Sequence, residues 1–123
     1  MGKISSKKKE MDGIIFDSAS ELSHYLVLKQ MLDDGEIHNL TDHPEFKLFD
    51  PFTIRGKSIR GMKYTADFYY ESEGQKHIVE VKGAYPAKAD YLMRRKIFLY
   101  MYGEEYIFHE VKYKGKSFKE KIW

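Results

Sequence analysis

The stretch that decides the fold runs from Tyr64 to Gly83 and reads YTADFYYESEGQKHIVEVKG. Its first part is rich in aromatic residues and its second part in isoleucine and valine, a composition typical of half-buried strands. A polar segment over residues 72–75 separates the two parts. The pattern therefore predicts two strands joined by a turn.

Charged side chains interrupt both predicted strands. Because side chains alternate between the faces of a strand, Glu80 and Lys82 share one face, while Asp67 lies on the other strand. Two neighbouring carboxylates repel each other unless a cation lies between them or one is protonated. Mg²⁺ prefers such oxygen ligands, and a lysine beside it can orient an attacking water or neutralise charge that develops on phosphorus. These residues indicate a metal-dependent site for phosphodiester hydrolysis.

An ordinary hairpin explains the same charges. Asp67 is then a solvent-facing residue, and Glu80 and Lys82 form a surface ion pair that contributes little to stability. Two observations favour the metal site. Aspartate is depleted in strands, and the aromatic neighbours of Asp67 indicate that it is buried.

With Asp67 on one strand and Glu80-Val81-Lys82 on the next, the chain resembles the PD-(D/E)xK nuclease superfamily. Ala66 replaces the proline that gives the superfamily its name, at a position that varies among the members. A closer resemblance covers nearly the whole chain and points to a small phage-associated branch. The matching segments are residues 12–21, 35–40, 64–68, 79–83 and 94–98.

The resemblance implies a metal-dependent DNA endonuclease with Mg²⁺ or Mn²⁺ as its cofactor. Asp67 and Glu80 would bind the ion together with the Val81 carbonyl. Lys82 would position the attacking water and stabilise the charge of the transition state. The products would carry a 5′-phosphate and a 3′-hydroxyl, as in related enzymes.

Residues 17–34 predict the first helix. They begin with a Ser18-x-x-Glu21 capping box, carry apolar residues at helical spacing and end before Gly35. Glu21 follows the apolar stripe and is expected to point towards the core, where it completes the cap, reaches the metal site or does both. By resemblance, an acid at this position joins the active site.

A second helix is expected over about residues 87–102, before Gly103. Arg94 lies on its apolar stripe among aromatic residues. A cation in that position either extends to solvent along the apolar surface or faces the scissile phosphate. By resemblance, relatives carry a basic residue near the site at this position, so Arg94 is a candidate catalytic residue.

The expected order of elements is one helix, three strands, one helix and one strand. It predicts an α/β fold with a mixed sheet flanked by helices. The same order forms the αβββαβ core of the restriction-endonuclease-like superfamily. Strands are expected at 45–49, continued over 52–54, at both halves of 64–83, and at 105–111.

The remaining segments carry weaker signals. Residues 35–41 are expected to form a connection, and the lysine-rich residues after Val111 a tail. His38 and His43 have no partner at metal-ligand spacing, so both are expected at the surface. The basic segment 55–61 is expected to be a hairpin turn, either solvated or in contact with a phosphate backbone.

The length of 123 residues corresponds to one domain. We expect a flexible basic arm over residues 1–10 and a single nuclease-like domain over residues 11–123. The chain has no cysteine, which excludes a disulfide framework, a thiol nucleophile and a cysteine-based zinc site. No apolar run approaches the length of a membrane span, and no signal peptide is recognisable. These features favour the cytoplasm, that of the host cell if a phage encodes the protein.

The formal net charge of +2 does not by itself indicate a nucleic-acid partner. Basic residues nevertheless cluster near both ends of the chain and at residues 94–96, while acids gather between residues 33 and 50. This asymmetry produces either a basic face for DNA or simply solvated tails.

The expected substrate is DNA. So small a chain has no room for a separate sequence-reading domain, which favours DNA recognised by its shape, such as a branched junction. A junction-cutting enzyme would be a homodimer and would act with phage replication or recombination proteins. The alternatives are a non-catalytic DNA-binding module on the same fold, a nuclease subunit targeted by a partner, and a structural protein without a metal response.

Overall fold

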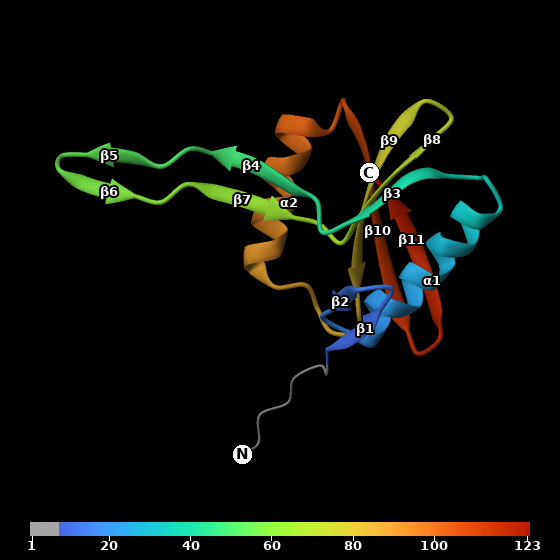
Figure 1. Cartoon of the computed structure of the whole chain (residues 1–123). Coiled ribbons are helices and arrows are strands. Elements are labelled where there is room, and N and C mark those ends of the chain that lie inside the picture. The colour runs from blue at the N-terminus through green and yellow to red at the C-terminus, as the bar shows by residue number, and fades with distance from the viewer. Residues whose placement is uncertain (1–7) are drawn as a thin grey trace, which may run out of the picture.

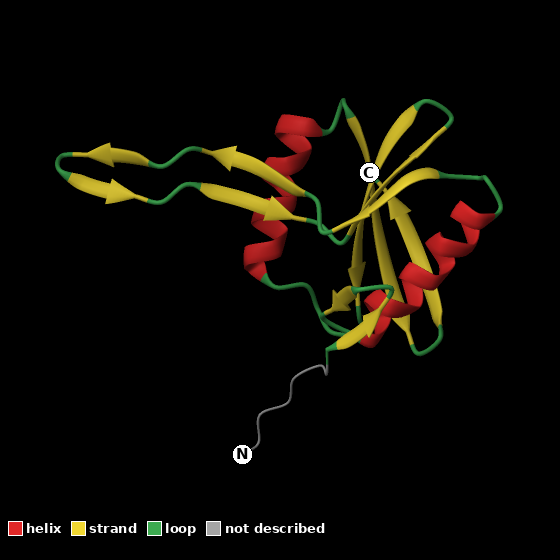
Figure 2. Ribbon diagram, viewed as in Figure 1, coloured by secondary structure: helices red, strands yellow, loops and turns green. Residues whose placement is uncertain are grey.

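A computed structural model describes residues 8–123 and consists of a central sheet, two helices and a projecting hairpin (Figure 1). Helix α1 spans Ala19–Asp33 and helix α2 spans Ala89–Tyr102. Figure 2 shows the two helices on either side of the strands of the central sheet. The fold class is therefore α/β with a mixed sheet flanked by helices, as the sequence predicts.

The central sheet has five strands in the order β11-β10-β9-β8-β3. Strands β9 and β10 run parallel and every other neighbouring pair runs antiparallel, so the sheet is mixed. Helix α2 connects the parallel pair, which needs such a crossover. The strand bounds are β3 His38–Asp42, β8 Phe68–Ser72, β9 Gln75–Lys82, β10 Tyr106–Lys114 and β11 Ser117–Ile122.

The order α1, β3, β8, β9, α2, β10 contains the expected sequence of one helix, three strands, one helix and one strand. Its first strand, however, is not the expected one. Residues 38–42, which overlap the connection expected over residues 35–41, form the edge strand β3. Their only half-buried apolar side chain is Leu40, so the sequence lacks the alternation that marks a strand, and backbone pairing with β8 supplies the stability.

The alternating segment Glu45–Phe49 is a strand, β4, but it lies outside the central sheet. It pairs with β7 (Met62–Thr65), and beyond it β5 (Phe52–Ile54) pairs with β6 (Lys57–Ile59). We call β4 to β7, residues 45–65, the hairpin arm, which projects away from the sheet in Figure 1. The buried face of β4 packs on α2, where the Phe46 and Phe98 rings lie 4.9 Å apart.

The aromatic stretch 64–70 is divided between two strands and is not one strand as expected. The Ala66 N–H donates to the carbonyl of Pro44 in the segment before β4, whereas the Asp67 N–H donates to the Val79 carbonyl of β9. The chain therefore changes its pairing partner between these two residues. Asp67 lies where the hairpin arm ends and the central sheet begins.

Helix α1 has the ends that the sequence predicts. The Ser18 hydroxyl accepts a hydrogen bond from the Glu21 N–H at 3.2 Å and caps the first turn. Gly35 has a φ of +79° beyond the last turn, and the Glu36 N–H reaches back to the Met31 carbonyl at 2.9 Å. That bond and the positive φ identify a Schellman motif. The hairpin turn at residues 73 and 74 is also as predicted, with positive φ at both positions.

Two apolar clusters cover opposite faces of the sheet, because side chains alternate along β9. Val79 and Val81 pack with α1, while Ile78 packs with α2 and the base of the hairpin arm. Phe98 of α2 is fully buried in the second cluster. Glu80 and Lys82 follow Ile78 on the face of the sheet that α2 covers, as the strand register predicts.

The ends of the described chain also pair. Residues 9–11 (β1) form a short hairpin with residues 14–16 (β2). Residues 117–122, within the expected lysine-rich tail, form the edge strand β11. The many lysines of this segment give no strand signal in the sequence, and the strand forms by backbone pairing with β10. Of the expected basic arm over residues 1–10, residues 1–7 lie outside the described part. Neither described helix has the length and apolarity needed to cross a membrane.

Candidate active site

Asp67 is a buried carboxylate, 8% exposed, at the junction between the hairpin arm and the sheet. The Val81 backbone N–H donates a hydrogen bond of 2.7 Å to its Oδ2 atom. This bond fixes the carboxylate against β9, two residues beyond Val79, whose carbonyl accepts from the Asp67 N–H. Since the N–H and C=O of a strand residue point to the same side, the Val81 carbonyl lies on the same edge of β9.

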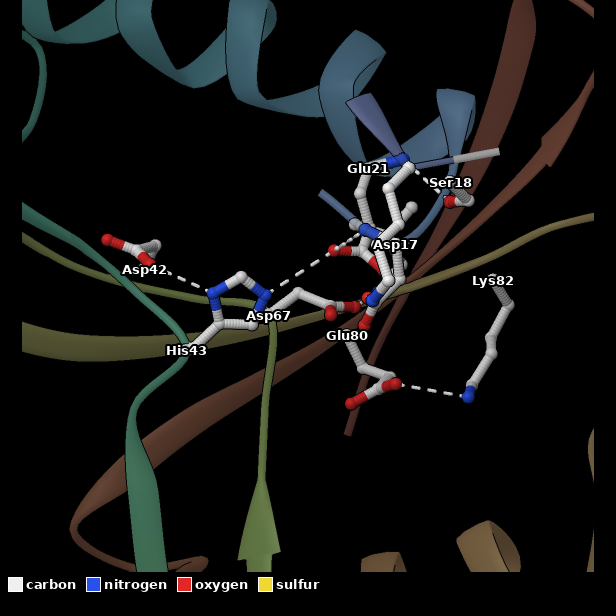
Figure 3. A network of polar contacts seen from close by, with 10 residues as sticks. Asp17, Ser18, Glu21, Asp42, His43, Asp67, Glu80 and Lys82 are labelled. Atoms are coloured by element: carbon white, nitrogen blue, oxygen red, sulfur yellow. Dashed lines mark hydrogen bonds and ion pairs between the residues drawn. The ribbon is translucent and has the colours of Figure 1, made fainter. Parts of the chain in front are cut away.

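Glu80 is buried as well, at 7% exposure, on the face of the sheet that α2 covers. Its carboxylate accepts a hydrogen bond from the Tyr64 hydroxyl of β7 and lies 3.0 Å from the Lys82 ammonium. Figure 3 shows the Glu80–Lys82 pair next to Asp67. The hairpin arm thus donates a hydrogen bond, through the Tyr64 hydroxyl, to the Glu80 carboxylate of the central sheet.

Glu21 approaches the same place from the first turn of α1. The residue is 7% exposed, and its carboxylate lies 3.6 Å from the His43 ring. The carboxylate also accepts a long hydrogen bond of 3.5 Å from the Asp17 N–H. The expected capping box is therefore only half formed, because the carboxylate turns inwards and contacts Asp17 instead of the Ser18 N–H (Figure 3).

The pKa values of these carboxyl groups reflect their crowding. Burial raises the pKa of Asp67 well above its usual value, and the charges of Glu80 and Glu21 raise it further. Burial likewise raises the pKa of Glu80, against the effect of Lys82 and Tyr64, and it raises the pKa of Glu21 together with the charge of Asp17. Without an added cation, the ionised forms of these groups are unfavourable in the folded protein.

Lys82 is held in place by two contacts. Its ammonium lies 3.0 Å from the Glu80 carboxylate and 3.8 Å from the centre of the Tyr91 ring, within the range of a cation–π interaction. The Tyr91 hydroxyl in turn donates to Glu110 of β10 at 2.5 Å. The amino group is thereby oriented beside the carboxylates, while its side chain remains partly accessible at 28% exposure.

Arg94 lies on α2 and borders a cleft next to Glu80 and Lys82. This cleft has a volume of about 360 Å³ and is bordered by Glu80, Lys82, Tyr91 and Arg94, among others. The Arg94 guanidinium forms an ion pair with Asp90 at 3.1 Å and donates to a backbone carbonyl of the hairpin arm. It is therefore anchored at the border of the cleft, where a phosphate group bound next to Glu80 would meet it.

The donor set fits a divalent cation. Asp67, Glu80 and Glu21 bring buried carboxylates with raised pKa values together, and Val81 adjoins them through its N–H bond to Asp67. Hard oxygen ligands of this kind suit Mg²⁺ or Mn²⁺. Among the described side chains, two basic groups lie at ion-pair distance from these carboxylates: the Lys82 ammonium, next to Glu80, and the His43 ring, next to Glu21.

Sequence reasoning missed three contributors to this site. His43, expected at the surface, is half-buried between Asp42 and Glu21; burial alone would lower its pKa, but these two acids raise it. Tyr64 and Tyr91 hold Glu80 and Lys82 through contacts that span the sheet, the arm and α2. The sequence signals only that they are apolar residues of strands and helices, so their polar role depends on the tertiary fold.

A second group of possible ligand atoms adjoins the first. Asp17, Glu21 and His43 place one ligand atom each within 4.8 Å of one another. Glu21 belongs to both groups. The acidic side of the site therefore extends from β9 to the start of α1.

Comparisons with known proteins bear on the family and the fold. A family described as "Protein of unknown function (DUF1064)" matches residues 1–115. No curated protein matches the chain. Among solved structures, the one titled "Crystal structure of SSO0001" aligns with a TM-score of 0.46 and 19% sequence identity, over 80% of this chain and 48% of that one. The chain thus spans about half the length of that protein.

Proposed function

This chain belongs to the DUF1064 family, and we propose that it is a metal-dependent DNA endonuclease that hydrolyses phosphodiester bonds. The observation that carries the proposal is the convergence of the Asp67, Glu80 and Glu21 carboxylates, whose charges raise the pKa of Asp67. Glu80 also pairs with Lys82, and these two residues border the cleft. Buried carboxylates with raised pKa values destabilise a fold, so they are typical of sites whose function needs them. The resemblance to the PD-(D/E)xK superfamily rests on the same residues.

Asp67 and Glu80 would hold Mg²⁺ or Mn²⁺ together with the Val81 carbonyl, and Glu21 would assist from α1. When bound, the ion polarises the phosphodiester group and makes water a stronger nucleophile at neutral pH. The buried position of the carboxylates keeps their electrostatic effect strong, because little water screens it.

Lys82 would orient the attacking water and stabilise the negative charge that develops on the phosphoryl oxygens. Its contacts with Glu80 and the Tyr91 ring fix its position before the substrate arrives. Arg94 would contact a neighbouring phosphate from α2. A planar, permanently charged guanidinium is suited to phosphate oxygens, which it binds in pairs.

The proposed substrate is branched DNA, such as a junction formed in phage recombination. Residues 8–123 form one five-stranded sheet with three two-stranded sheets beside it and no separate DNA-reading domain, which favours recognition of DNA shape. Two strands would be cut by a homodimer, acting in the cytoplasm with phage replication or recombination proteins. A monomer that cuts a four-way junction would contradict the homodimer.

The experiment is a cleavage assay with Mg²⁺ or Mn²⁺ and labelled DNAs: a single strand, a linear duplex, a flap and a four-way junction. Lys82→Ala should lower the cleavage rate about 10²–10³-fold, the usual loss when a charge-stabilising group is removed. Lys76→Ala is the matched control, since Lys76 lies on the same strand and face and pairs with Glu105 at the surface.

Three outcomes would change the proposal. Equal cleavage by wild type and Lys82→Ala would remove Lys82 from the site. Tight binding of one DNA without any cleavage would favour a DNA-binding module. Cleavage that appears only after a second protein is added would favour a subunit that a partner targets.

A further inference from the structure

The outer half of the hairpin arm, residues 52–60, has an unusual surface. We call it the arm tip; it comprises β5, β6 and the turn between them. Every residue of the tip is exposed, including the large apolar side chains of Phe52, Ile54 and Ile59 at 49%, 42% and 38%. A two-stranded ribbon alone is only marginally stable in water, so an uncovered apolar face on it requires an explanation.

The strand register places the apolar side chains on one face. Residues directly opposite each other in an antiparallel pair point to the same side, and Phe52 pairs with Ile59 while Ile54 pairs with Lys57. Thr53 and Ser58 pair on the other side. The tip is therefore an amphipathic ribbon, with three apolar residues and one lysine on one face and two small hydroxyl residues on the other.

The charge of the tip has a single sign. Arg55, Lys57 and Arg60 lie within residues 52–60, and the segment contains no acid. In the described part of the chain these cations make no ion pair, in contrast to Lys47 and Lys63 at the inner half of the arm, which pair with Asp50 and Glu45. The tip thus presents unneutralised positive charge beside its apolar face.

The backbone of the arm is well specified despite its exposure. Arg55 and Gly56 both have positive φ, +47° and +77°, which is the two-residue turn that matches the twist of paired strands. At the centre of the arm Gly61 packs so closely that a Cβ atom would lie 2.7 Å from the Phe49 carbonyl oxygen. The turn residues and Gly61 therefore specify the conformation of the arm.

We propose that the arm tip docks in a groove of the DNA duplex that flanks the cleaved bond, with its apolar face against the bases and its cations on the phosphates. A two-stranded ribbon fits the major groove, and apolar side chains can also enter between base steps. Positive charge without neighbouring acids complements the phosphate backbone. This inference rests on the proposed function, because it takes DNA as the substrate.

The connection between tip and site sets the distance of this contact. Strands β6 and β7 cover residues 57–65 and lead directly to Asp67. At about 3.3 Å per residue, these nine residues span at most about 30 Å, which equals about nine base pairs of duplex DNA. The tip should therefore contact the duplex up to about nine base pairs from the cleaved phosphate.

The first test measures binding of a fluorescent 40-base-pair duplex in EDTA. The triple variant Arg55→Asn, Lys57→Gln and Arg60→Gln removes the tip cations, and asparagine keeps the left-handed turn. Its affinity for the duplex should fall at least about tenfold. The slope of log affinity against log salt concentration should become smaller by about 2–3, since each phosphate contact contributes about 0.9 to that slope. The control removes three exposed lysines of the β10–β11 hairpin, by Lys114→Gln, Lys116→Gln and Lys119→Gln. An equal loss in the control would overturn the proposal.

The second test compares the two faces of the ribbon. The double variant Phe52→Ala and Ile54→Ala should weaken binding about threefold or more, whereas Thr53→Ala with Ser58→Ala on the opposite face should leave it unchanged. Equal effects on both faces would contradict the docking geometry. If the apolar-face variant instead changes the oligomeric state in light scattering and leaves DNA affinity unchanged, the face is covered by a second copy and the proposal fails.

The third test separates this inference from the proposed function. With Mg²⁺, the labelled DNA that wild type cuts, rebuilt with duplex flanks four base pairs long, should be cut equally by wild type and the triple tip variant, while long flanks should favour wild type. Equal rates on long flanks would refute tip docking and leave the nuclease intact. Loss of binding in the tip variant without any cleavage by wild type would support tip docking and refute the nuclease.

Discussion

The base and the tip of the hairpin arm both depart from the usual burial of residues, but in opposite directions. At its base, Asp67 and Glu80 are ionisable and buried; at its tip, Phe52 and Ile54 are apolar and exposed. Folded proteins normally bury apolar groups and expose charges. Both departures lower stability, and departures of this kind are typical of functional or strained sites. The contrast predicts that the same kind of substitution has different effects at the two ends.

The largest difference should appear between two phenylalanines. Phe98→Ala removes a ring that is 0% exposed and packs on Phe46, Tyr64 and Phe108. It should lower the free energy of unfolding by about 3–5 kcal/mol. Phe52→Ala at the arm tip should change it by no more than about 0.5 kcal/mol. Urea unfolding followed by circular dichroism measures both, and a large loss for Phe52→Ala would show that the tip belongs to the folding core.

The next effect concerns the added cation. A divalent ion that binds only the folded state at a hundred times its dissociation constant should raise the free energy of unfolding by about 2.7 kcal/mol. Thermal unfolding with Mg²⁺ or Mn²⁺ should therefore shift to higher temperature in the wild type and not in Asp67→Asn. An equal shift in both proteins would place the ion elsewhere, for example at Asp17 and His43.

A smaller effect is expected at the border of the cleft. Arg94→Ala should lower the cleavage rate about tenfold, equivalent to about 1.4 kcal/mol. Its ion pair with Asp90 is exposed, so the free energy of unfolding should change by less than about 1 kcal/mol. Asp90→Ala removes the same ion pair and serves as the control. If both variants lose activity equally, Arg94 acts only through the position of α2.

The smallest effect concerns stability against pH. Because the folded state raises the pKa of Asp67, it retains a proton at pH values where the unfolded chain has lost it. In EDTA, stability should therefore fall as the pH rises from about 4 towards the raised pKa. Asp67→Asn should reduce this fall and gain about 1 kcal/mol at neutral pH, roughly 4 °C in melting temperature. A less stable Asp67→Asn protein would contradict the crowding of the carboxylates.

Local signals were sufficient for part of the fold. Ser18, Glu21 and Gly35 predict both ends of α1, because capping and a positive φ depend on residues close in sequence. The two-residue turn before β9 is predictable for the same reason. The face shared by Glu80 and Lys82 follows from the period of a strand alone. These predictions need no knowledge of what the elements pack against.

Strand partners could not be predicted in the same way. Residues 38–42 carry little apolar pattern and still form an edge strand, while residues 45–49 alternate well and leave the sheet for the arm. In each case backbone hydrogen bonds to a distant segment decide the outcome. The lysine-rich residues 117–122 pair with β10 for the same reason.

The sequence by itself determined the α/β class, the caps of α1, and the choice of Asp67, Glu80 and Lys82 as candidate site residues. Tertiary structure decided which carboxylates meet, since Glu21 and Asp67 come from elements far apart along the chain. It also decided that His43, Tyr64 and Tyr91 surround them and that residues 45–65 project as an arm. The reason is physical: capping, turns and side-chain period act between near neighbours, whereas burial and charge crowding depend on which distant segments share one space.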